Sequence, residues 1–567
     1  MSLATACEEL KKLVATYDTR WLLGDLSSLM RFAGGQHAQD QLGELSSPLR
    51  QFYFLAGLLV SSDPTLGTDL RYTPEKWQQM VRLLNEIEQQ YEQLYQPKDE
   101  EAITEQWMKI RQVAMPSFMA YFNQGPLNYE EQGLWWLNRL YPSFDELIVA
   151  ETGLTVADFD AFYQQLDELM QQNFQSFMSP RAPMRPDWRT YTKVVMRNTA
   201  PPALQAFLTP KKEALFHFMA DKGIATRFFP VELVSPALPL EKVEKLLALL
   251  ATTRQATDFL YYTSTKPANP LLARPIVDLG DGLYQVFEVK QVLHAITAIL
   301  DRICTSTNAS KRRYISLKGK LLEDKLVVLF ENFFPGCQIF RSYYVDGNEQ
   351  DILVLWENCA FIVEAKGYNL REPLRDPDRA FVRIQDDFDA CLGYGYSQTR
   401  RVEKKFIEGV PLRLTDEHGN LRAEIDTRQY AHDFSIIVNL HSFGQVQCDL
   451  SALLKLGNDD VFPWAIRLDD LEVFLLTLLA QKKTPRDFVD FLLFREELHG
   501  KLTCLDELAI CGGFLSGQLT AKSTRQRKYV TVHPDLADVF DEQYRKGMGF
   551  ENEKLLVEKR SGNYLFM

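Results

Sequence analysis

Three residues, Asp351, Glu364 and Lys366, have side chains and a spacing that suit binding of a divalent cation beside a phosphate. They lie at the ends of two apolar runs separated by Glu357-Asn358. If those two residues form a hairpin turn, counting outward from the turn pairs Asp351 with Glu364. Directly opposed residues share one face of a hairpin with Cβ atoms about 5 Å apart. Strand alternation places Lys366 on that face too.

The chemistry of this group follows from its charges. Two carboxylates at that separation repel each other, and a divalent cation relieves the repulsion. Oxygen ligands suit Mg²⁺ or Mn²⁺, and magnesium takes one or two carboxylates with waters and substrate phosphates. The Lys366 ammonium can orient a water or stabilise charge on a phosphate. The alternative is that Asp351 ends a turn and that Glu364 and Lys366 form a surface ion pair, worth under about 1 kcal/mol.

The elements that position these residues can be read from hydrophobic periodicity and breaker residues. A helix over 320–334 ends at Pro335-Gly336, and strands follow over 338–345, 351–356 and 359–364. A long, mostly helical stretch over 379–406 can be interrupted at Gly393 and Gly395, and a further strand covers 433–440. The expected order is helix, three strands, helix, strand.

The spacing Asp-(x)12-Glu-x-Lys, set in this order of elements, resembles the PD-(D/E)XK nuclease superfamily, which includes restriction endonucleases and Holliday-junction resolvases. The resemblance covers about Lys318 to Leu440. Gln350 stands where the motif has proline, a departure common in the superfamily. The resemblance implies a restriction-endonuclease-like αβββαβ core and a Mg²⁺-dependent endonuclease that hydrolyses DNA phosphodiester bonds.

The resemblance also implies a role for each residue of the site. Asp351 and Glu364 would bind the metal with help from the Ala365 carbonyl, and Lys366 would be the catalytic lysine. Glu323 would face the site from the first helix as a catalytic and metal-binding residue, although a helix glutamate is usually just solvated.

Many members of the superfamily carry a glutamine on the helix that follows the motif. Gln385 and Gln398 are both candidates in this chain, and Gln398 is preferred because it precedes Arg400 and Arg401, which could meet a phosphate.

Basic residues flank the motif although the formal net charge of the chain is −13. A local cationic surface is what binding to a phosphate backbone requires, so Lys318, Lys320, Arg400 and Arg401 are candidate nucleic-acid contacts. A solvated charged face is the alternative.

DNA is the expected partner, with RNA as a fainter option. A nuclease-fold protein that binds or scaffolds with little cleavage is the rival function. Two cuts across a duplex would favour a homodimer, and the helical regions could bind a protein partner.

With 567 residues, the chain is too long for one hydrophobic core. We expect a multidomain α+β protein with four consecutive parts. These are a helical region over 1–252, a connecting β-hairpin and helix over 253–310, the nuclease-like domain over 311–445, and a mainly helical accessory region over 446–567. The Pro-rich segment 179–186 is expected to be a loop or boundary, and further helices are expected over 77–95, 105–122, 155–170, 211–222, 241–252, 290–303 and 505–515, with two more over 463–494.

Several other classes lack support in the sequence. The N-terminus lacks the apolar run of a signal peptide, and no apolar stretch approaches the roughly 20 residues of a membrane span, so a cytoplasmic protein without membrane partners is expected. The eight cysteines contain no Cys-x-x-Cys pair and are expected to be buried thiols. Motifs of P-loop ATPases, zinc proteases and α/β-hydrolases are absent.

Overall fold

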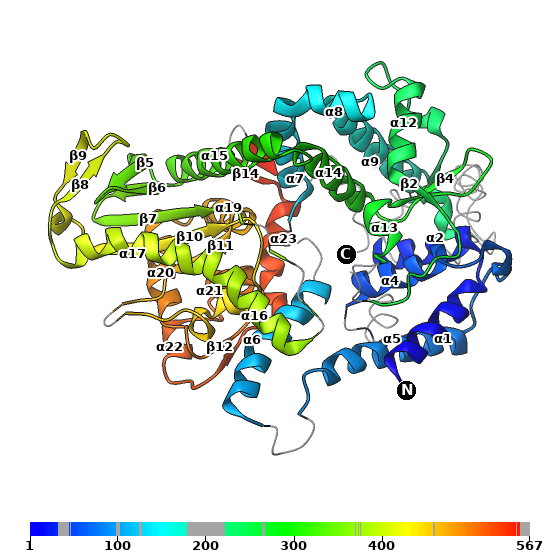
Figure 1. Cartoon of the computed structure of the whole chain (residues 1–567), viewed down its shortest axis with the longest axis horizontal. Helices are drawn as coiled ribbons and strands as arrows, with labels where there is room; N and C mark the ends of the chain where they lie inside the picture. The colour runs from blue at the N-terminus through cyan, green and yellow to red at the C-terminus, as the bar shows by residue number, and fades with distance from the viewer. Residues whose placement is uncertain are drawn as a thin grey trace, which may run out of the picture. The chain divides into compact units, whose positions relative to one another are not determined.

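The chain combines α-helices with several β-sheets and forms two compact units (Figure 1). Unit 1 contains Met1–Gln93 and Gly133–Ser310, and unit 2 contains Leu94–Gln132 and Lys311–Lys559. The computed structural model describes residues 1–31, 45, 47–97, 103–123, 128–178, 221–262, 267–368, 370–371, 374, 376–457, 460–550 and 553–555. The Pro-rich segment 179–186 and most of the helix expected over 211–222 lie outside these residues.

Unit 1 is built from helices around a small sheet with the strand order β1-β4-β3-β2. The expected hairpin is present, because β3 and β4 pair in antiparallel fashion around a turn in which Gly280, Asp281 and Gly282 all have positive φ. Its strands are β1 (Arg227–Phe228), β2 (Ala251–Thr253), β3 (Ile276–Asp278) and β4 (Tyr284–Val286). Its main helices are α1 (Leu3–Ala15), α2 (Thr19–Arg31), α4 (Pro48–Val60), α5 (Pro74–Gln93), α8 (Asp145–Thr152), α9 (Val156–Met178), α12 (Leu240–Leu250), α13 (Pro270–Ala273) and α14 (Val289–Cys304), while α7 (Glu130–Leu140) leads into it from unit 2.

Unit 2 is organised on a seven-stranded sheet with the order β11-β10-β7-β6-β5-β8-β9. Strands β7, β10 and β11 run parallel, and the remaining neighbours pair antiparallel. The strands are β5 (Gln338–Val345), β6 (Asn348–Trp356), β7 (Cys359–Lys366), β8 (Leu412–Thr415), β9 (Leu421–Ile425), β10 (His432–Asn439) and β11 (Trp464–Arg467).

Helices lie on both sides of this sheet. In Figure 1, α15 (Asn308–Phe333) and α17 (Tyr394–Ile407) lie on opposite sides of β6 and β7. Side-chain alternation explains this, since Leu353 and Ile362 share a buried cluster with Val402 of α17, whereas the Phe361 ring packs against Phe334 beside the end of α15. The other helices of unit 2 are α6 (Glu105–Asn123), α16 (Pro377–Phe388), α18 (Gln445–Cys448), α19 (Leu468–Ala480), α20 (Pro485–Glu496), α21 (Glu507–Leu515), α22 (Ala521–Thr524) and α23 (Asp538–Arg545), and the short strand pairs are β12 (Leu502–Thr503) with β13 (Val530–Thr531) and β14 (Met548–Phe550) with β15 (Glu553–Leu555).

The boundaries of the two units differ from those of the four consecutive parts expected from the sequence. Helix α6 belongs to unit 2, where it packs against α16, and Lys109 lies 5.7 Å from the centre of the Phe381 ring. Residues 253–310 belong to unit 1. Periodicity identifies the apolar face of a helix but not the surface that buries it, so the sequence could not assign α6 to its unit.

Two local expectations in unit 2 need correction, and one hairpin was not expected. Helix α15 begins at Asn308, where the Thr307 hydroxyl accepts a hydrogen bond from the Ser310 N–H, so the polar stretch before residue 320 is helical too. Residues 464–467 form β11 instead of the start of a helix. The hairpin β8–β9, which was not expected, widens the sheet beyond β5.

Candidate active site

The β6–β7 hairpin has the register predicted from its two-residue turn. The pairs run from Trp356 with Cys359 outward to Ile352 with Val363, and Glu357 takes a φ of +48° in the turn. Beyond the last of these pairs, the next two residues are Asp351 and Glu364. The hairpin therefore brings both carboxylates to one end of two buried strands.

The carboxylates at this end are held by backbone N–H groups. Asp351 donates its N–H to Oε1 of Glu364 at 3.3 Å, and Ala365 donates its N–H to Oδ2 of Asp351 at 2.7 Å. Ala365 thus contacts Asp351 through its nitrogen, and the metal-binding role expected for its carbonyl stays a prediction. Each carboxylate orients the other strand's backbone, which fixes the two side chains against each other.

Lys366 lies among four side chains. Its Nζ donates to Oε2 of Glu364 at 2.7 Å and to Oε1 of Gln398 at 2.7 Å, and it lies 3.5 Å from Oδ2 of Asp351. The Tyr394 ring centre is 5.4 Å from the same ammonium. The structure therefore gathers Asp351, Glu364, Lys366 and Gln398 into one polar cluster, which we call the carboxylate–lysine cluster.

Gln398 reaches this cluster because α17 lies close to β10. A Cβ added to Gly395 would lie 3.0 Å from Cγ2 of Ile437, which is closer than most side-chain contacts, so glycine permits the approach. The two helices α16 and α17 are joined by a π-helical turn, Asp389–Gly393, at the point where the sequence suggested an interruption. Gln385, the other candidate glutamine, lies on α16 before this turn.

Burial and the close spacing of charges shift the pKa values of Glu364 and Lys366. The Glu364 side chain is fully buried, while those of Lys366 and Asp351 are 11% and 18% exposed. Burial, together with the Asp351 charge, raises the pKa of Glu364 to about 8 despite the nearby ammonium. Burial acts to lower the pKa of Lys366, but the two carboxylates outweigh it and raise that pKa. Lys366 is therefore held as a cation, and Glu364 favours its protonated form near neutral pH in the protein alone.

Glu323 contributes to the site through its charge. It comes from α15, on the other side of the sheet, and its Oε2 lies 3.5 Å from the Ser342 hydroxyl. Burial and the Asp351 carboxylate raise the pKa of Glu323 to about 7. The structure thus links Glu323 to Asp351 electrostatically without making it a hydrogen-bonding member of the carboxylate–lysine cluster.

The donor set can be compared with what a divalent cation requires. Within the described ranges, no group of three or more His, Cys, Asp or Glu side chains is arranged to hold a metal ion. Magnesium, however, needs only one or two protein carboxylates when waters and phosphates complete its shell. Asp351 and Glu364 meet that requirement, and a bound cation would favour the ionised form of Glu364, whose pKa is raised by burial and by the Asp351 charge. The residues therefore fit a magnesium-type site of two carboxylates.

Tyr343 places a buried hydroxyl within the electrostatic influence of Glu364 and Asp351, which the sequence did not reveal. It packs in the apolar cluster beneath α17 and is fully buried. Its hydroxyl has no hydrogen-bond partner in the part of the chain that the structure describes. Burial and the charges of Glu364 and Asp351 raise its pKa well above the ordinary value. Its pairing with Gln350, next to Asp351, is the signal that could have identified it.

The basic residues expected to contact nucleic acid differ in their exposure and in their ion pairs. Lys320 is exposed on α15, Lys318 lies 5.6 Å from the centre of the Tyr314 ring, and Arg401 is partly exposed. Arg400 is only 12% exposed and forms ion pairs with Glu403 and Asp460. The guanidinium of Arg400 is thus committed to carboxylates inside unit 2 instead of facing a phosphate.

Comparisons of the chain with protein-family models, with curated proteins and with solved structures find no match. Across the described residues, none of the helices combines the length and apolar character that a membrane crossing needs. Function is therefore inferred from the chemistry of the side chains that the fold brings together.

Proposed function

We propose that unit 2 is a metal-dependent nuclease that hydrolyses phosphodiester bonds of DNA. The observation that carries this proposal is the convergence of Asp351, Glu364, Lys366 and Gln398 at one end of a buried hairpin. The order α15, β5–β6–β7, α16–α17 and β10 supports a restriction-endonuclease-like core, to which β8, β9 and β11 are additions.

Each residue of this site has a separate role in the proposed hydrolysis. Asp351 and Glu364 would hold Mg²⁺ or Mn²⁺, which supplies Lewis-acid polarisation of the phosphate when bound. The Lys366 ammonium stabilises negative charge on the phosphate or orients the attacking water. Gln398 holds that ammonium in place through its 2.7 Å hydrogen bond. Glu323, whose pKa of about 7 lies near neutrality, can accept a proton from water.

Positive charge near this site supports a nucleic-acid substrate, and DNA is the one that the resemblance implies. Lys320 lies one helical turn before Glu323 on α15, so both side chains lie on one side of the helix. A cation at that place can contact a phosphate beside the one that is cleaved. Arg401 and Lys318 add positive charge on α17 and α15, whereas Arg400 is not used in this proposal.

The decisive experiment is cleavage of plasmid DNA and of short labelled duplex, single-stranded and RNA substrates. Wild-type protein is assayed with Mg²⁺, with Mn²⁺ and with EDTA, beside Lys366→Ala. Lys522→Ala, which changes an exposed lysine on α22, is the matched control. Metal-dependent cleavage that is lost in Lys366→Ala and kept in Lys522→Ala supports the proposal. Equal cleavage by both variants would mean that the site lies elsewhere.

A second function, nucleic-acid binding without cleavage, is favoured by one observation. Lys366 bridges both carboxylates, so the cluster already carries a cation of its own. Under this alternative, DNA binding is the same in Mg²⁺ and in EDTA, and no substrate is cut. Binding measured by fluorescence anisotropy under both conditions separates the two functions.

A further inference from the structure

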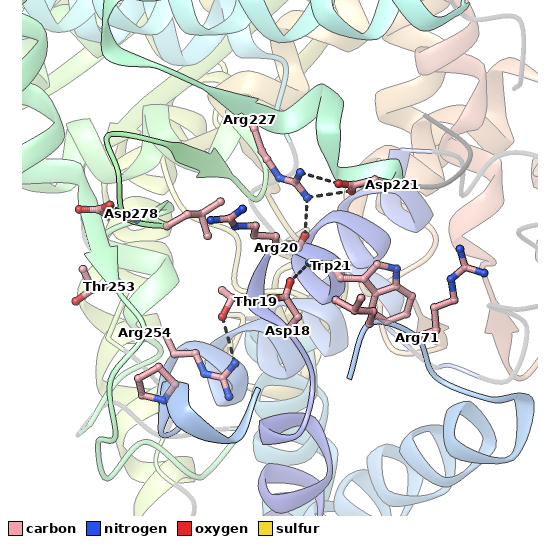
Figure 2. A pocket seen from close by; sticks show the side chains of 14 residues that line it. Asp18, Thr19, Arg20, Trp21, Arg71, Asp221, Arg227, Thr253, Arg254 and Asp278 are labelled. Atoms are coloured by element: carbon pink, nitrogen blue, oxygen red, sulfur yellow. Dashed lines mark hydrogen bonds and ion pairs between the residues drawn. The ribbon is translucent and has the colours of Figure 1, made fainter. Parts of the chain in front are cut away.

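A cavity of about 720 Å³ lies in unit 1 and is separate from the carboxylate–lysine cluster. Its walls come from the start of α2, from the loop before α5 and from the ends of β2 and β3. Figure 2 shows these walls with four arginines, Arg20, Arg71, Arg227 and Arg254, among the lining side chains. The volume is within the range of about 300–1,000 Å³ that small-molecule sites occupy.

Two of the four arginines hold the cavity together. Arg254, which is 8% exposed, donates to the carbonyls of Ala15 and Tyr17 at 2.6 and 2.8 Å. Arg227 pairs with Asp221 through two bonds of 2.7 and 2.9 Å, and it also donates to the Arg20 carbonyl at 3.3 Å. The terminal nitrogens of both guanidinium groups are thus bonded to other parts of unit 1 and connect the walls of the cavity.

The wall formed by α2 is fixed by a close approach of two glycines. A Cβ added to Gly223 would lie 2.7 Å from the Cα of Gly24, so neither position has room for a side chain. This contact holds α2 against the short helix η5 (Lys222–Thr226), which leads into Arg227. The cavity is therefore pre-formed in the protein alone.

The other two arginines have no such structural task. Arg20 and Arg71 are exposed, and in the described part of the chain no hydrogen bond or ion pair involves either guanidinium group. In Figure 2 the Trp21 side chain lies between Arg20 and Arg71. Free guanidinium groups on both sides of an indole match a ligand that combines phosphate with a flat ring, because arginine binds phosphate through paired donors and aromatic rings stack on bases.

Two carboxylates in the cavity complete this set of groups. Asp18 accepts a hydrogen bond from the backbone N–H of Trp21 through Oδ1 at 3.0 Å, and Asp278 accepts one from the backbone N–H of Gly280 through Oδ1 at 2.8 Å. Each is therefore oriented by the backbone while its Oδ2 stays available as an acceptor. A carboxylate in that arrangement can accept hydrogen bonds from sugar hydroxyls, as acidic residues do in dinucleotide sites.

We propose that this cavity of unit 1 binds a ribonucleotide. Arg20 and Arg71 contact the phosphate, the Trp21 indole stacks on the base, and Asp18 or Asp278 accepts hydrogen bonds from the ribose hydroxyls. The inference is independent of cleavage by unit 2, because no residue of that unit lines the cavity.

The test is isothermal titration calorimetry of the full chain with AMP, GMP, CMP and UMP. Each titration contains EDTA, so that metal-dependent binding at unit 2 makes no contribution. At least one nucleotide is expected to bind with micromolar affinity, and inorganic phosphate and the matching nucleoside are expected to bind at least about tenfold more weakly. Arg20→Ala and Arg71→Ala should each weaken nucleotide binding by about ten- to a hundredfold, because each removes a charge-assisted contact to phosphate. Arg20→Lys should retain part of the affinity.

Arg139→Ala is the matched control, since Arg139 is exposed on α7 and does not line the cavity. It should bind like wild type. Arg20 is exposed, so its truncation is expected to leave the thermal midpoint unchanged, which separates lost binding from lost folding. The proposal is overturned by no binding of any of the four nucleotides, by unchanged affinity in both arginine variants, or by inorganic phosphate binding as tightly as the nucleotide.

Discussion

The Nζ atom of Lys366 lies 2.7 Å from Oε1 of Gln398, so a residue of β7 is held by a side chain from α17. The other amide atom, Nε2 of Gln398, donates to the Glu349 carbonyl at 3.4 Å. Gln398 therefore connects the lysine to the beginning of the strand that carries Asp351. Because the amide is neutral, it positions the ammonium without changing the charge of the site.

Replacing Gln398 by alanine should slow the cleavage proposed for unit 2. Loss of a residue that hydrogen-bonds to a catalytic side chain and orients it typically reduces activity by about 10- to 100-fold. We expect kcat to fall while KM changes little, since Gln398 orients Lys366 and does not contact substrate. The free energy of unfolding should fall by only about 1 kcal/mol, because Lys366 keeps its ion pairs. Gln385→Ala is the matched control, and an equal loss of activity there would contradict the assignment of Gln398.

Replacing Gly395 by alanine should displace α17 from the sheet. The new methyl group would lie 3.0 Å from Cγ2 of Ile437, so the helix or the isoleucine must move. Overpacking of this kind costs about 1–3 kcal/mol, and the shift should also loosen the bond between Gln398 and Lys366. Urea denaturation and cleavage assays would measure both effects.

Two further variants define the cause of that loss. Gly319→Ala is the control, because a Cβ at this helical position of α15 meets no atom within 4 Å, and it should stabilise the protein by up to about 1 kcal/mol. Ile437→Ala, combined with Gly395→Ala, should restore the position of α17 and part of the activity. Unchanged activity in Gly395→Ala alone would mean that α17 does not set the geometry of Gln398.

The sequence was sufficient to predict the part of the site that depends on local rules. The turn at Glu357-Asn358 and the apolar runs on both sides determine the register of β6 and β7, and that register was confirmed. The hairpin β3–β4 was predicted for the same reason. Such features depend on residues that are close in the chain, so side-chain alternation and turn chemistry are enough to find them.

Features that depend on distant residues were not predictable in this way. Arg400 was expected to face a phosphate, but its partner Asp460 lies far along the chain and draws the guanidinium inward. Strand β11 was read as helix because Trp464–Arg467 runs directly into the apolar helix α19, and a short buried parallel strand has no alternating pattern of its own. The approach of Gly395 to Ile437 likewise exists only in the folded chain.

Breaking the buried ion pair between Lys325 and Glu472 should destabilise unit 2 strongly. The two groups lie 2.8 Å apart with 3% and 4% of their side chains exposed, and Gln132 also donates to Glu472 at 2.7 Å. Lys325→Met leaves a buried carboxylate without its cation, which costs about 3–5 kcal/mol. The double variant Lys325→Met with Glu472→Leu should recover most of that loss in urea denaturation. A double variant no more stable than the single one would contradict this account.

The imidazole of His499 should make unit 2 less stable as the pH falls from 7 to 5. Burial, together with the nearby Arg495 charge, lowers the pKa of His499 to about 4. In the unfolded chain a histidine takes up its proton near pH 6.5. Between these two values the unfolded state binds a proton that the native state does not, so the stability from the neutral imidazole is present above pH 6.5 and is lost toward pH 4. For this group the loss between pH 7 and pH 5 is about 2 kcal/mol.

The measurement must separate His499 from buried carboxyl groups that act in the opposite direction. Burial raises the pKa values of Glu403 and Glu496 to about 7, so these groups destabilise the native state as the pH rises through the same range. We therefore compare wild type with His499→Gln at pH 5 and pH 7, which cancels the carboxyl contribution. The change in unfolding free energy between the two pH values should differ by about 2 kcal/mol between the proteins. His418→Gln, at an exposed histidine, should behave as wild type, and an identical pH response in His499→Gln would show that this imidazole is protonated in the native state at pH 5.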